Sequence, residues 1–524
     1  MSQGEVKRKQ IQYYSYIIGV ILFIFFSKKI GNNGIMYLAI AIEYIAIFVT
    51  FLGDYFADVY GRMIRYRRKR NQYNDVRILK KRIIIYQLIL GIVSFLIAFF
   101  GAEYISAIIF GAARGALVIR ILSPVLLLKT ISSLLTGYFQ SFGMQIISAI
   151  STLCRQVLFG VFGNLFCTRF LEYGQKVSAL LKDPDCKGFY GAIGLCLAIL
   201  LTDVIVLVSL CIYYFLSDTG IDKKRSSRGV SPSEKLFDTI MSLSYLNLQN
   251  SVIWVFKRLL VFLPLIICVD FERRGIFYGK FLAVFSIPLL LLVSRYQLFY
   301  ARLVSAIKNR ENRMIRDYIQ VGVQYTWVVG IFVATLFAVL AAQISESFFE
   351  NDILLTGLLQ KGALLFVFLT LFAYFYLVHA ASNKKTECLI GILSNGILYV
   401  ILSYFFYGKL DQNLEAFIYA GIISFLVGTL ILGISVIIQM HIRLDFIPIF
   451  ILPLICVGVT GIILLFICKY LTPHIGALLC VILSLIIGMV IYLASLGLCR
   501  VFTEMEIEKI YGKFAHKLLS VIFK

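Results

Sequence analysis

Apolar runs of about 20 residues recur along the whole chain, and this recurrence constrains the fold more than any other feature. A helix of that length matches the hydrocarbon thickness of a bilayer. The 524 residues are 60% hydrophobic and only 15% charged, with a mean hydropathy of +0.89. Because a soluble domain is roughly half apolar, this composition excludes soluble, disordered and disulfide-scaffold folds. We therefore expect an all-α polytopic membrane protein.

Gly, Pro and charged residues divide the apolar runs into about fourteen predicted transmembrane helices. Their ranges are 11–28, 34–61, 83–100, 118–140, 145–166, 189–216, 238–265, 276–301, 321–344, 357–380, 388–408, 415–440, 447–468 and 475–499. The basic run Lys7–Lys9 resembles the start of a signal peptide, but no small-residue cleavage site follows the first span. Basic residues favour one side of this topology by about three to one, which predicts that both termini are cytoplasmic.

A shift of 240 residues aligns the two halves of the chain. It places Gly143 on Asn383, and the exit of the third span, Gly101–Tyr104, on Ala341–Ile344. An offset of six spans keeps both halves in one orientation, as in parallel repeats related by an axis along the membrane normal. The predicted domains are an N-lobe (1–216), a cytoplasmic linker (217–237), a C-lobe (238–440), two extra spans (441–500) and an amphipathic C-terminal helix (501–524).

The chemistry of soluble proteins is largely missing from the sequence. A net charge of +22 would suggest nucleic acid, but the basic residues flank apolar spans and no recognition fold accompanies them. No Gly-Lys pair is followed by the Ser or Thr of a phosphate loop, and the four histidines are not spaced as metal ligands. We expect no enzyme activity, cofactor, metal or nucleic-acid partner. Cys167 and Cys186 flank the longest predicted outer loop and could form a disulfide.

Acidic residues inside spans are costly in hydrocarbon and indicate a cavity or a partner. Glu43, Asp54, Asp58 and Arg62 follow one stripe of the second predicted span, and Asp203 lies in the sixth. We interpret these five residues as candidates for coupling or gating. A proton or cation would act at Glu43 or Asp203, whereas Asp58 and Arg62 could instead form a plain ion pair near the membrane surface.

Basic residues inside spans form the larger set, and they indicate an anionic substrate. The predicted substrate-binding residues are Arg155, Lys257, Arg258, Lys280 and Arg295. Lys280 and Arg295 are fifteen residues apart and would share a face of the eighth span. The other cations in spans, Arg120, Lys129 and Lys361, could instead reach the membrane surface by snorkelling. Guanidinium groups bind phosphate bidentately, so a phosphate-bearing lipid or glycan fits this set.

Three other classes of function compete with this interpretation. An ion-coupled multidrug or small-molecule exporter would require a neutral or acidic chamber. A membrane-embedded glycan polymerase would require catalytic groups on a large outer loop. A non-transporting membrane scaffold would tolerate neutral residues at Arg295.

Three stretches resemble polysaccharide flippases. They are GIMYLAIAIEY (Gly34–Tyr44) with GRMIRYRRKRNQYND (Gly61–Asp75), TGYFQSFG (Thr136–Gly143), and YGK (Tyr278–Lys280) leading to KNRENR (Lys308–Arg313). The sequence is therefore similar to the multidrug/oligosaccharidyl-lipid/polysaccharide exporter superfamily, in the branch of stage V sporulation protein B and the lipid-linked peptidoglycan precursor flippases.

This resemblance implies two six-helix lobes, alternating access, and movement of an undecaprenyl-diphosphate-linked saccharide across the bacterial plasma membrane to the outer leaflet. It also implies cavity arginines on spans one, two and eight. Arg295 matches span eight, Arg62 lies only at the end of span two, and span one has no arginine between Ile11 and Phe26.

The C-terminal tail carries apolar residues at helical spacing, with Lys509, Lys513 and Lys517 on another face. Such a helix could anchor on anionic phospholipid or dock a partner in cell-envelope glycan synthesis. Neither the saccharide nor the coupling ion can be read from the sequence.

Overall fold

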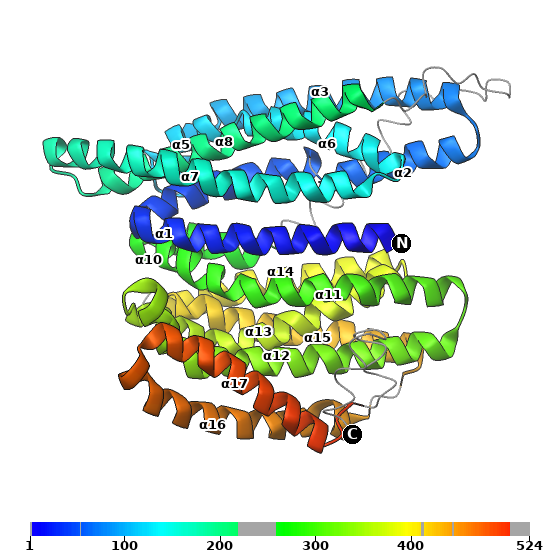
Figure 1. Cartoon of the computed structure of the whole chain (residues 1–524), viewed down its shortest axis with the longest axis vertical. Coiled ribbons are helices and arrows are strands. Elements are labelled where there is room, and N and C mark those ends of the chain that lie inside the picture. The colour runs from blue at the N-terminus through cyan, green and yellow to red at the C-terminus, as the bar shows by residue number, and fades with distance from the viewer. Residues whose placement is uncertain (1–2, 53, 218–257, 410–412, 443–444, 503–524) are drawn as a thin grey trace. The chain divides into compact units, whose positions relative to one another are not determined.

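The computed structural model describes residues 3–52, 54–217, 258–409, 413–442 and 445–502. Within these ranges every regular element is a helix and none is a strand (Figure 1). The predicted all-α membrane fold is therefore confirmed. Most of the predicted linker, Lys257 and nearly all of the predicted C-terminal helix lie outside the described residues.

Twelve helices of the described ranges are long and apolar enough to cross a membrane. The first, Gly4–Thr50, has 47 residues, about twice the length that one crossing needs. It bends at Gly31, whose φ of +73° suits glycine, and so it contains the first predicted span and most of the second. The seventh predicted span is described only at its end, as the apolar helix Arg258–Ile267. The described helices thus follow the predicted order, and the count of fourteen is approximate.

The chain divides into two compact units, Gln3–Gly279 and Lys280–Lys524. This boundary differs from the predicted one, which placed residues 258–279 in the second half. The first unit holds this segment through polar contacts. Arg258 pairs with Glu43, and the Arg274 guanidinium donates to the Phe110 carbonyl at 2.6 Å.

The first unit is built around one central helix. Its elements are α1 (Gln3–Leu52), α2 (Asp54–Lys69), α3 (Tyr73–Phe100), α4 (Ala102–Tyr104), η1 (Ile105–Ile109), α5 (Gly115–Leu122), α6 (Val125–Ser141), α7 (Gln145–Leu181), α8 (Asp185–Leu216), the helix Arg258–Ile267 and α10 (Phe271–Ile276). Helix α6 contacts α1, α2, α3, α7 and α8, and none of its residues is exposed. Side chains of α6 therefore face the interior of the unit.

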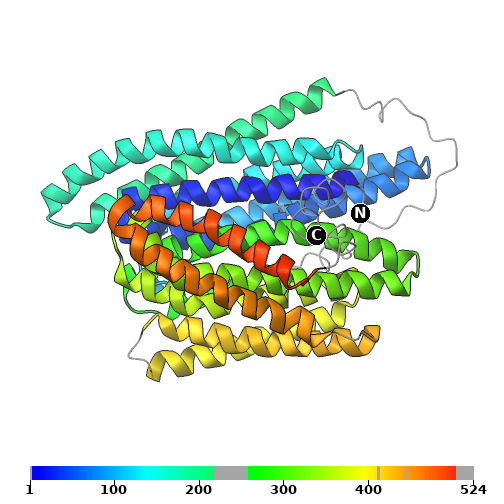
Figure 2. The same cartoon turned by 60° about the horizontal axis from the view of Figure 1, so that its bottom comes forward.

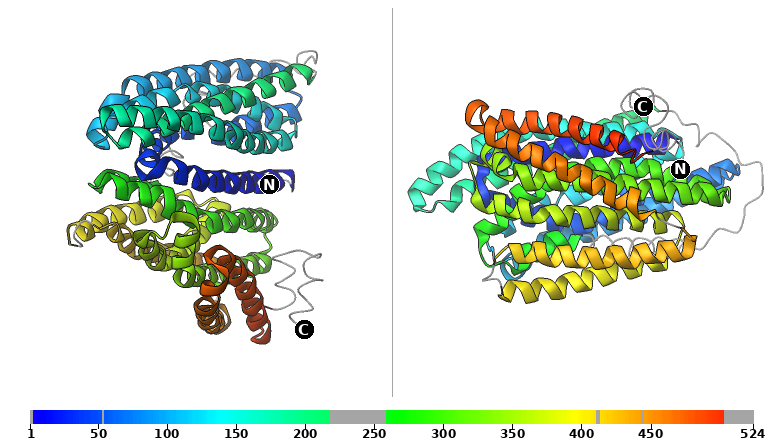
Figure 3. Two further views of the ribbon diagram at one scale, coloured as in Figure 1. Left: turned by 60° about the vertical axis from the view of Figure 1, so that its left-hand side comes forward. Right: turned by 90° about the horizontal axis from the view of Figure 1, so that it is seen from below.

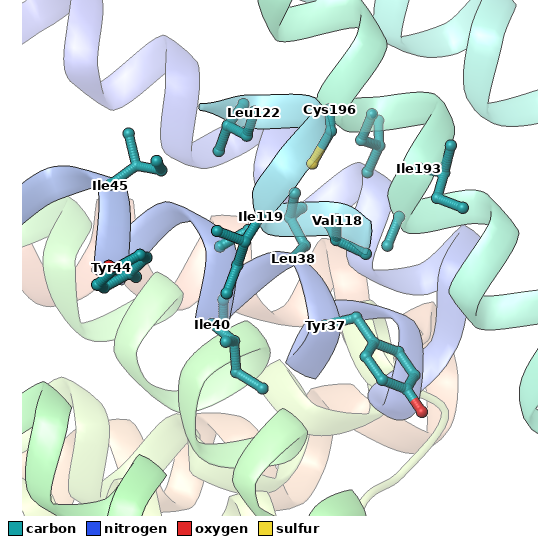
Figure 4. Packing of buried hydrophobic residues seen from close by; sticks show 14 of the residues in the cluster. Tyr37, Leu38, Ile40, Tyr44, Ile45, Val118, Ile119, Leu122, Ile193 and Cys196 are labelled. Atoms are coloured by element: carbon teal, nitrogen blue, oxygen red, sulfur yellow. The ribbon is translucent and has the colours of Figure 1, made fainter. Parts of the chain in front are cut away.

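The core of the first unit joins α1 to α5 and α8. Figure 4 shows Leu38 and Ile40 of α1 near Val118 and Ile119 of α5, with Cys196 of α8 beside them. Close approach is possible because α1 and α8 meet through glycines. A Cβ added to Gly34 would lie 2.7 Å from the Gly188 carbonyl oxygen.

The second unit begins in η2 (Phe277–Phe281), a π-helical stretch that crosses the boundary. It continues as α11 (Leu282–Lys308), α12 (Asn312–Phe349), α13 (Ile353–Ala381), α14 (Lys385–Lys409), α15 (Glu415–Met440), η3 (Ile447–Ile451), α16 (Leu452–Ile475) and α17 (Ala477–Leu498). Helix α13 packs against α12 and α15, and α14 and α15 run side by side (Figure 3).

Helices α16 and α17 form an antiparallel pair on α12 (Figure 2). The Trp327 indole N–H of α12 donates to the Phe450 carbonyl at 3.1 Å, and the Tyr492 hydroxyl of α17 donates to the Val328 carbonyl at 3.1 Å. The Phe332 and Tyr492 rings stack at 4.9 Å. The two predicted extra spans are thus attached to the second unit by both polar and aromatic contacts.

The predicted repeat is visible in equivalent turns. Gly143 after α6 and Asn383 after α13 have φ of +85° and +57°. Their hydrogen bonds correspond at an offset of 240, since the amide after each turn residue donates to Phe139 in one case and to His379 in the other. The predicted match of Gly101–Tyr104 with Ala341–Ile344 is wrong, because α12 continues without a break to Phe349.

The prediction of a long outer loop between Cys167 and Cys186 is also wrong. Helix α7 extends to Leu181 and α8 begins at Asp185, so the expected loop is mostly a helical hairpin (Figure 1). Arg114 pairs with Asp183 in the turn at 2.6 Å, and its guanidinium holds the pKa of that carboxyl below its ordinary value. Cys167 and Cys186 are both free thiols, so the disulfide alternative is not supported.

Candidate functional site

The basic residues predicted inside spans are, with one exception among those described, paired with acids. Arg120 pairs with Glu103 at 2.8 Å, Lys280 with Asp352 at 2.7 Å, Lys361 with Glu415, Arg258 with Glu43, and both Lys129 and Arg155 with Asp203. Arg295 is the exception. It is partly buried on α11 and forms no hydrogen bond or ion pair with any described residue.

Three helices of the first unit meet in a charged cluster around Asp203 of α8. Its Oδ1 atom lies 3.1 Å from Lys129 Nζ of α6 and 2.5 Å from Arg155 Nε of α7. Asp203 is 2% exposed, whereas the Lys129 and Arg155 side chains are 19% and 24% exposed. The second carboxylate oxygen, Asp203 Oδ2, is buried and has no hydrogen-bond partner within the described residues.

Glu43 forms a second buried cluster in the same unit. Its carboxylate is fully buried and accepts two hydrogen bonds from Arg258, one of them from Nε at 3.2 Å. The Tyr278 hydroxyl donates to the same carboxylate at 2.8 Å. Glu43 and Arg258, predicted for different roles, are therefore partners. The arrangement ties the end of the seventh span and the start of η2 to α1.

The predicted stripe from Glu43 to Arg62 runs from α1, described to Leu52, into α2, described from Asp54, and Gly53 between them lies outside the described residues. Nothing is described of the Asp54 side chain. The Asp58 carboxylate pairs with Arg8 at 2.8 Å, while Arg62 is exposed and its Nε donates only to the Asp58 backbone carbonyl at 3.3 Å. The predicted pairing of the Asp58 and Arg62 side chains is therefore wrong.

Arg8 is a functional candidate that the sequence analysis missed. The first span was expected to begin at residue 11, but α1 begins at Gln3, so Arg8 lies on the first helix and is 6% exposed. The first helix thus does carry an arginine, N-terminal to the stretch 11–26 in which none occurs. The acidic Asp58, which needs a cation nearby, was the signal that could have indicated it.

Lys280 and Arg295 have different surroundings, although they were predicted to share a face. Lys280 lies in the π-helical η2, which changes the angular relation between residues on either side of it. Its partner Asp352 also caps α13, because Asp352 Oδ1 accepts from the Leu354 and Leu355 amides at 3.1 and 3.2 Å. Lys280 thus supports the start of α13, whereas Arg295 has no acidic partner among the described residues.

Metal chemistry finds no support in the part of the chain that the structure describes, where no group of three or more His, Cys, Asp or Glu residues could hold a metal ion. The charged residues instead form pairs and small clusters along helices. Such an arrangement can bind, position or release a charged solute.

No protein-family model and no curated protein matches the sequence. Solved structures do match it. An inward-facing multidrug resistance transporter of the MATE family, in the MOP superfamily, is 13% identical with a TM-score of 0.66, covering 82% of this chain and 95% of the other. The inward closed form of the lipid II flippase MurJ is 13% identical with a TM-score of 0.62, covering 93% and 98%.

A MOP superfamily transporter from Pyrococcus furiosus, whose binding pocket is described as having reverse polarity, is 12% identical with a TM-score of 0.58, covering 83% of this chain and 94% of the other. At such low identity these matches establish the fold. The chain is thus a multi-pass membrane protein with the fold of the MOP superfamily, which is the multidrug/oligosaccharidyl-lipid/polysaccharide exporter superfamily that the sequence resembles.

Proposed function

We propose that the chain is a flippase that moves a lipid-linked saccharide diphosphate from the cytoplasmic to the outer leaflet by alternating access. The undecaprenyl diphosphate carrier is part of this proposal, as are a bacterial plasma membrane and cytoplasmic termini. The protein acts without enzymatic chemistry. Anionic phospholipid and a partner in cell-envelope glycan synthesis are its further proposed contacts.

Arg295 carries the proposal. An arginine on a membrane helix is costly, and such residues pair with one another or mark the path of a substrate. Each of the other described cations predicted inside a span has an acidic partner, and Arg295 has none within the described ranges. A phosphate would supply the missing charge with two parallel hydrogen bonds.

The charge balance inside each unit supports an anionic substrate. Two cations, Lys129 and Arg155, approach the Asp203 carboxylate in the first unit, and Arg295 has no acidic partner among the described residues of the second. With the cytoplasm negative, outward movement of each negative headgroup charge gains roughly 2.3 kcal/mol per 100 mV. A diphosphate headgroup therefore fits both the unpaired positive charge of Arg295 and outward movement across the membrane.

The extent of the structural matches also favours a flippase. The MurJ match covers 93% of the chain and the MATE match 82%, a difference of about 58 residues. That difference is close in size to the last two spans, which have 29 and 22 residues. A lipid-carrying neighbour thus accounts for more of this chain than a multidrug neighbour does.

The direct test is a flipping assay in proteoliposomes with a fluorescent saccharide on a polyprenyl diphosphate. Wild type should expose the label at the far leaflet, and Arg295→Ala should reduce the rate at least tenfold, because the guanidinium proposed to bind the phosphate is lost. Arg120→Ala, which removes an exposed cation already paired with Glu103, is the matched control and should flip normally. Equal rates for both variants would contradict the proposal.

An ion-coupled exporter of small molecules is the second candidate, and the TM-score of 0.66 to a multidrug transporter favours it. If the protein is such an exporter, an ion gradient should drive uptake of organic cations into the same vesicles, and polyprenyl diphosphate should have no effect on that uptake. A non-transporting scaffold would show neither activity.

A further inference from the structure

Helix α7 is longer than one crossing of a bilayer requires. Its exposed apolar stripe begins at Ile146, continues through Val157 and Val161, and ends at Leu165. The next exposed position along the helix is the polar Thr168. From the first to the last residue of the stripe the helix rises about 29 Å, which matches a hydrocarbon core of about 30 Å. The edge of the hydrocarbon therefore lies near Leu165.

The rest of α7 and the start of α8 project beyond this edge as a helical hairpin. In Figure 1 the hairpin extends at the left past the other helices of the first unit. Leu181 ends α7 and lies about 24 Å further along the helix than Leu165. The headgroups of one leaflet take only about 5 to 8 Å of this distance, so the tip lies about 16 Å or more into water.

The tip of the hairpin is apolar although water surrounds it. Leu180 and Leu181 are 82% and 64% exposed, and Ala179 before them is exposed as well. Three consecutive exposed apolar residues are unfavourable in water unless a partner covers them. On the lipid-facing stripe such residues contact hydrocarbon, but at this distance from the bilayer lipid does not reach them.

Cations flank the apolar tip. Lys176 is one helical turn before Leu180, and Lys182 directly follows Leu181. Lys187 of α8 lies against α7, because a Cβ added to Gly174 would be 3.1 Å from the Lys187 Cα atom. The three lysines are exposed, and none forms an ion pair with a described residue.

Two of the three acids in the same hairpin are already engaged. Asp183 pairs with Arg114 at 2.6 Å, and the Asp185 carboxylate accepts from the Asn33 side-chain amide at 2.6 Å. Only Glu172, farther from the tip, remains exposed. The end of the hairpin thus presents an apolar centre with a positive rim.

This combination of groups selects among the possible occupants. A second copy of this chain would bring like charges together, which disfavours self-association through the tip. An acidic glycan would match the lysines but leave the leucines in water. A protein surface with an apolar pocket and acidic residues around it matches both features, since such interfaces have an apolar core and a polar rim.

We propose that the tip of the α7–α8 hairpin is a docking site for a protein domain that receives Leu180 and Leu181 in an apolar pocket with an acidic rim. The inference rests on the proposed function, whose topology places the tip outside the cell, on the side where the flipped saccharide is delivered. The partner therefore belongs to the class of enzymes that transfer a saccharide from its polyprenyl carrier.

The test is photocrosslinking from the tip in the cells that make the protein. The photoreactive residue p-benzoylphenylalanine replaces Leu181 in the full chain, and mass spectrometry identifies the adducts that form on illumination. We expect one major protein adduct, whose crosslinked peptide belongs to an extracytoplasmic domain and lies beside Asp or Glu residues. The same photoreactive residue at Val157, on the lipid-facing stripe, should not give this adduct.

Charge and apolar contact are then tested separately. Lys176→Glu combined with Lys187→Glu should reduce the adduct yield at least fivefold, because it reverses the charge of the rim. Leu180→Ser should do the same by removing an apolar side chain from the pocket. The matched control, Lys69→Glu combined with Lys81→Glu, makes the same change of charge at exposed lysines of α2 and α3 and should leave the yield unchanged.

A folding defect would be recognised directly. All the substituted side chains are exposed, so the apparent Tm of each variant should stay within about 2 °C of wild type. Adducts with lipid alone, an adduct of two copies of this chain, no adduct, or a yield that charge reversal does not change would each overturn the proposal.

The outcomes separate this docking site from the proposed function, because the flipping assay in proteoliposomes contains no partner. If lipid-linked saccharide is flipped but the tip gives no charge-dependent protein adduct, the flippase proposal stands and the docking site is wrong. If the adduct forms as expected but nothing is flipped, the docking site stands and the flippase proposal fails.

Discussion

Replacing Glu43 by glutamine should destabilise the first unit measurably, because this carboxylate neutralises Arg258 inside the protein. Glu43 is fully buried and accepts three hydrogen bonds, two from Arg258 and one from Tyr278 at 2.8 Å. A glutamine oxygen can still accept from Tyr278, but the charge and at least one Arg258 bond are lost. Removing one partner of a buried ion pair costs about 3–5 kcal/mol.

That cost must be reduced here because the Arg258 side chain is 36% exposed and water screens its charge. We expect about 2 kcal/mol. For a unit of this size, 1 kcal/mol corresponds to about 2–4 °C, so the apparent Tm should fall by about 4–8 °C. The assay is thermal unfolding at one scan rate in one detergent, since unfolding of membrane proteins is often irreversible.

Glu103→Gln provides the matched control. It removes the same charge from an ion pair with Arg120 whose side chains are 71% and 38% exposed, and it should cost less than about 1 kcal/mol. A double-mutant cycle of Glu43→Gln with Arg258→Gln should return a coupling energy near 2 kcal/mol. Equal Tm shifts for the two glutamate variants, or zero coupling, would refute the view that Glu43 holds residues 258–279 to the first unit.

Two further results are expected. Gly322→Ala should reduce the free energy of unfolding by about 2 kcal/mol or more, and so lower the apparent Tm, because the added Cβ would lie 1.8 Å from the Tyr374 hydroxyl. Gly408→Ala meets nothing within 4 Å and should not lower the Tm; the same thermal assay checks both variants, and equal effects would contradict the packing. The Arg114 ion pair lowers the pKa of Asp183, so its contribution is complete above the ordinary aspartate pKa of 3.8 and is lost as the pH falls through the lower folded-state value. The Tm difference between wild type and Asp183→Asn should therefore be present at neutral pH and shrink in acid, and a difference that does not change with pH would contradict this assignment.

The order and type of the helices could be predicted because a membrane helix must satisfy its backbone within one continuous apolar segment. That requirement is local in sequence, and so is the turn chemistry that Gly143 and Asn383 share. Helix ends were harder to predict. Helices α1, α3, α7 and α12 extend beyond the apolar runs, because a helix that leaves the bilayer can continue into water with its backbone hydrogen bonds intact.

The ionisable residues of the site were identified correctly as unusual, but their partners could not be predicted. Glu43 and Arg258 are 215 residues apart, and Asp203 is 48 residues from Arg155. Only tertiary packing brings such pairs together. Lys280, which was predicted to bind substrate, pairs with Asp352, a residue 72 positions away that no local sequence pattern indicates.

The central claim is that the protein carries an anionic lipid-linked saccharide that depends on Arg295, the described in-span cation without an acidic partner. Native mass spectrometry of the full chain, extracted in mild detergent, tests this claim most directly. We expect a co-purifying polyprenyl diphosphate saccharide in wild type and in Arg120→Ala, and its loss in Arg295→Ala. Bulk phospholipid alone in all three, even after addition of the lipid-linked saccharide, would contradict the account.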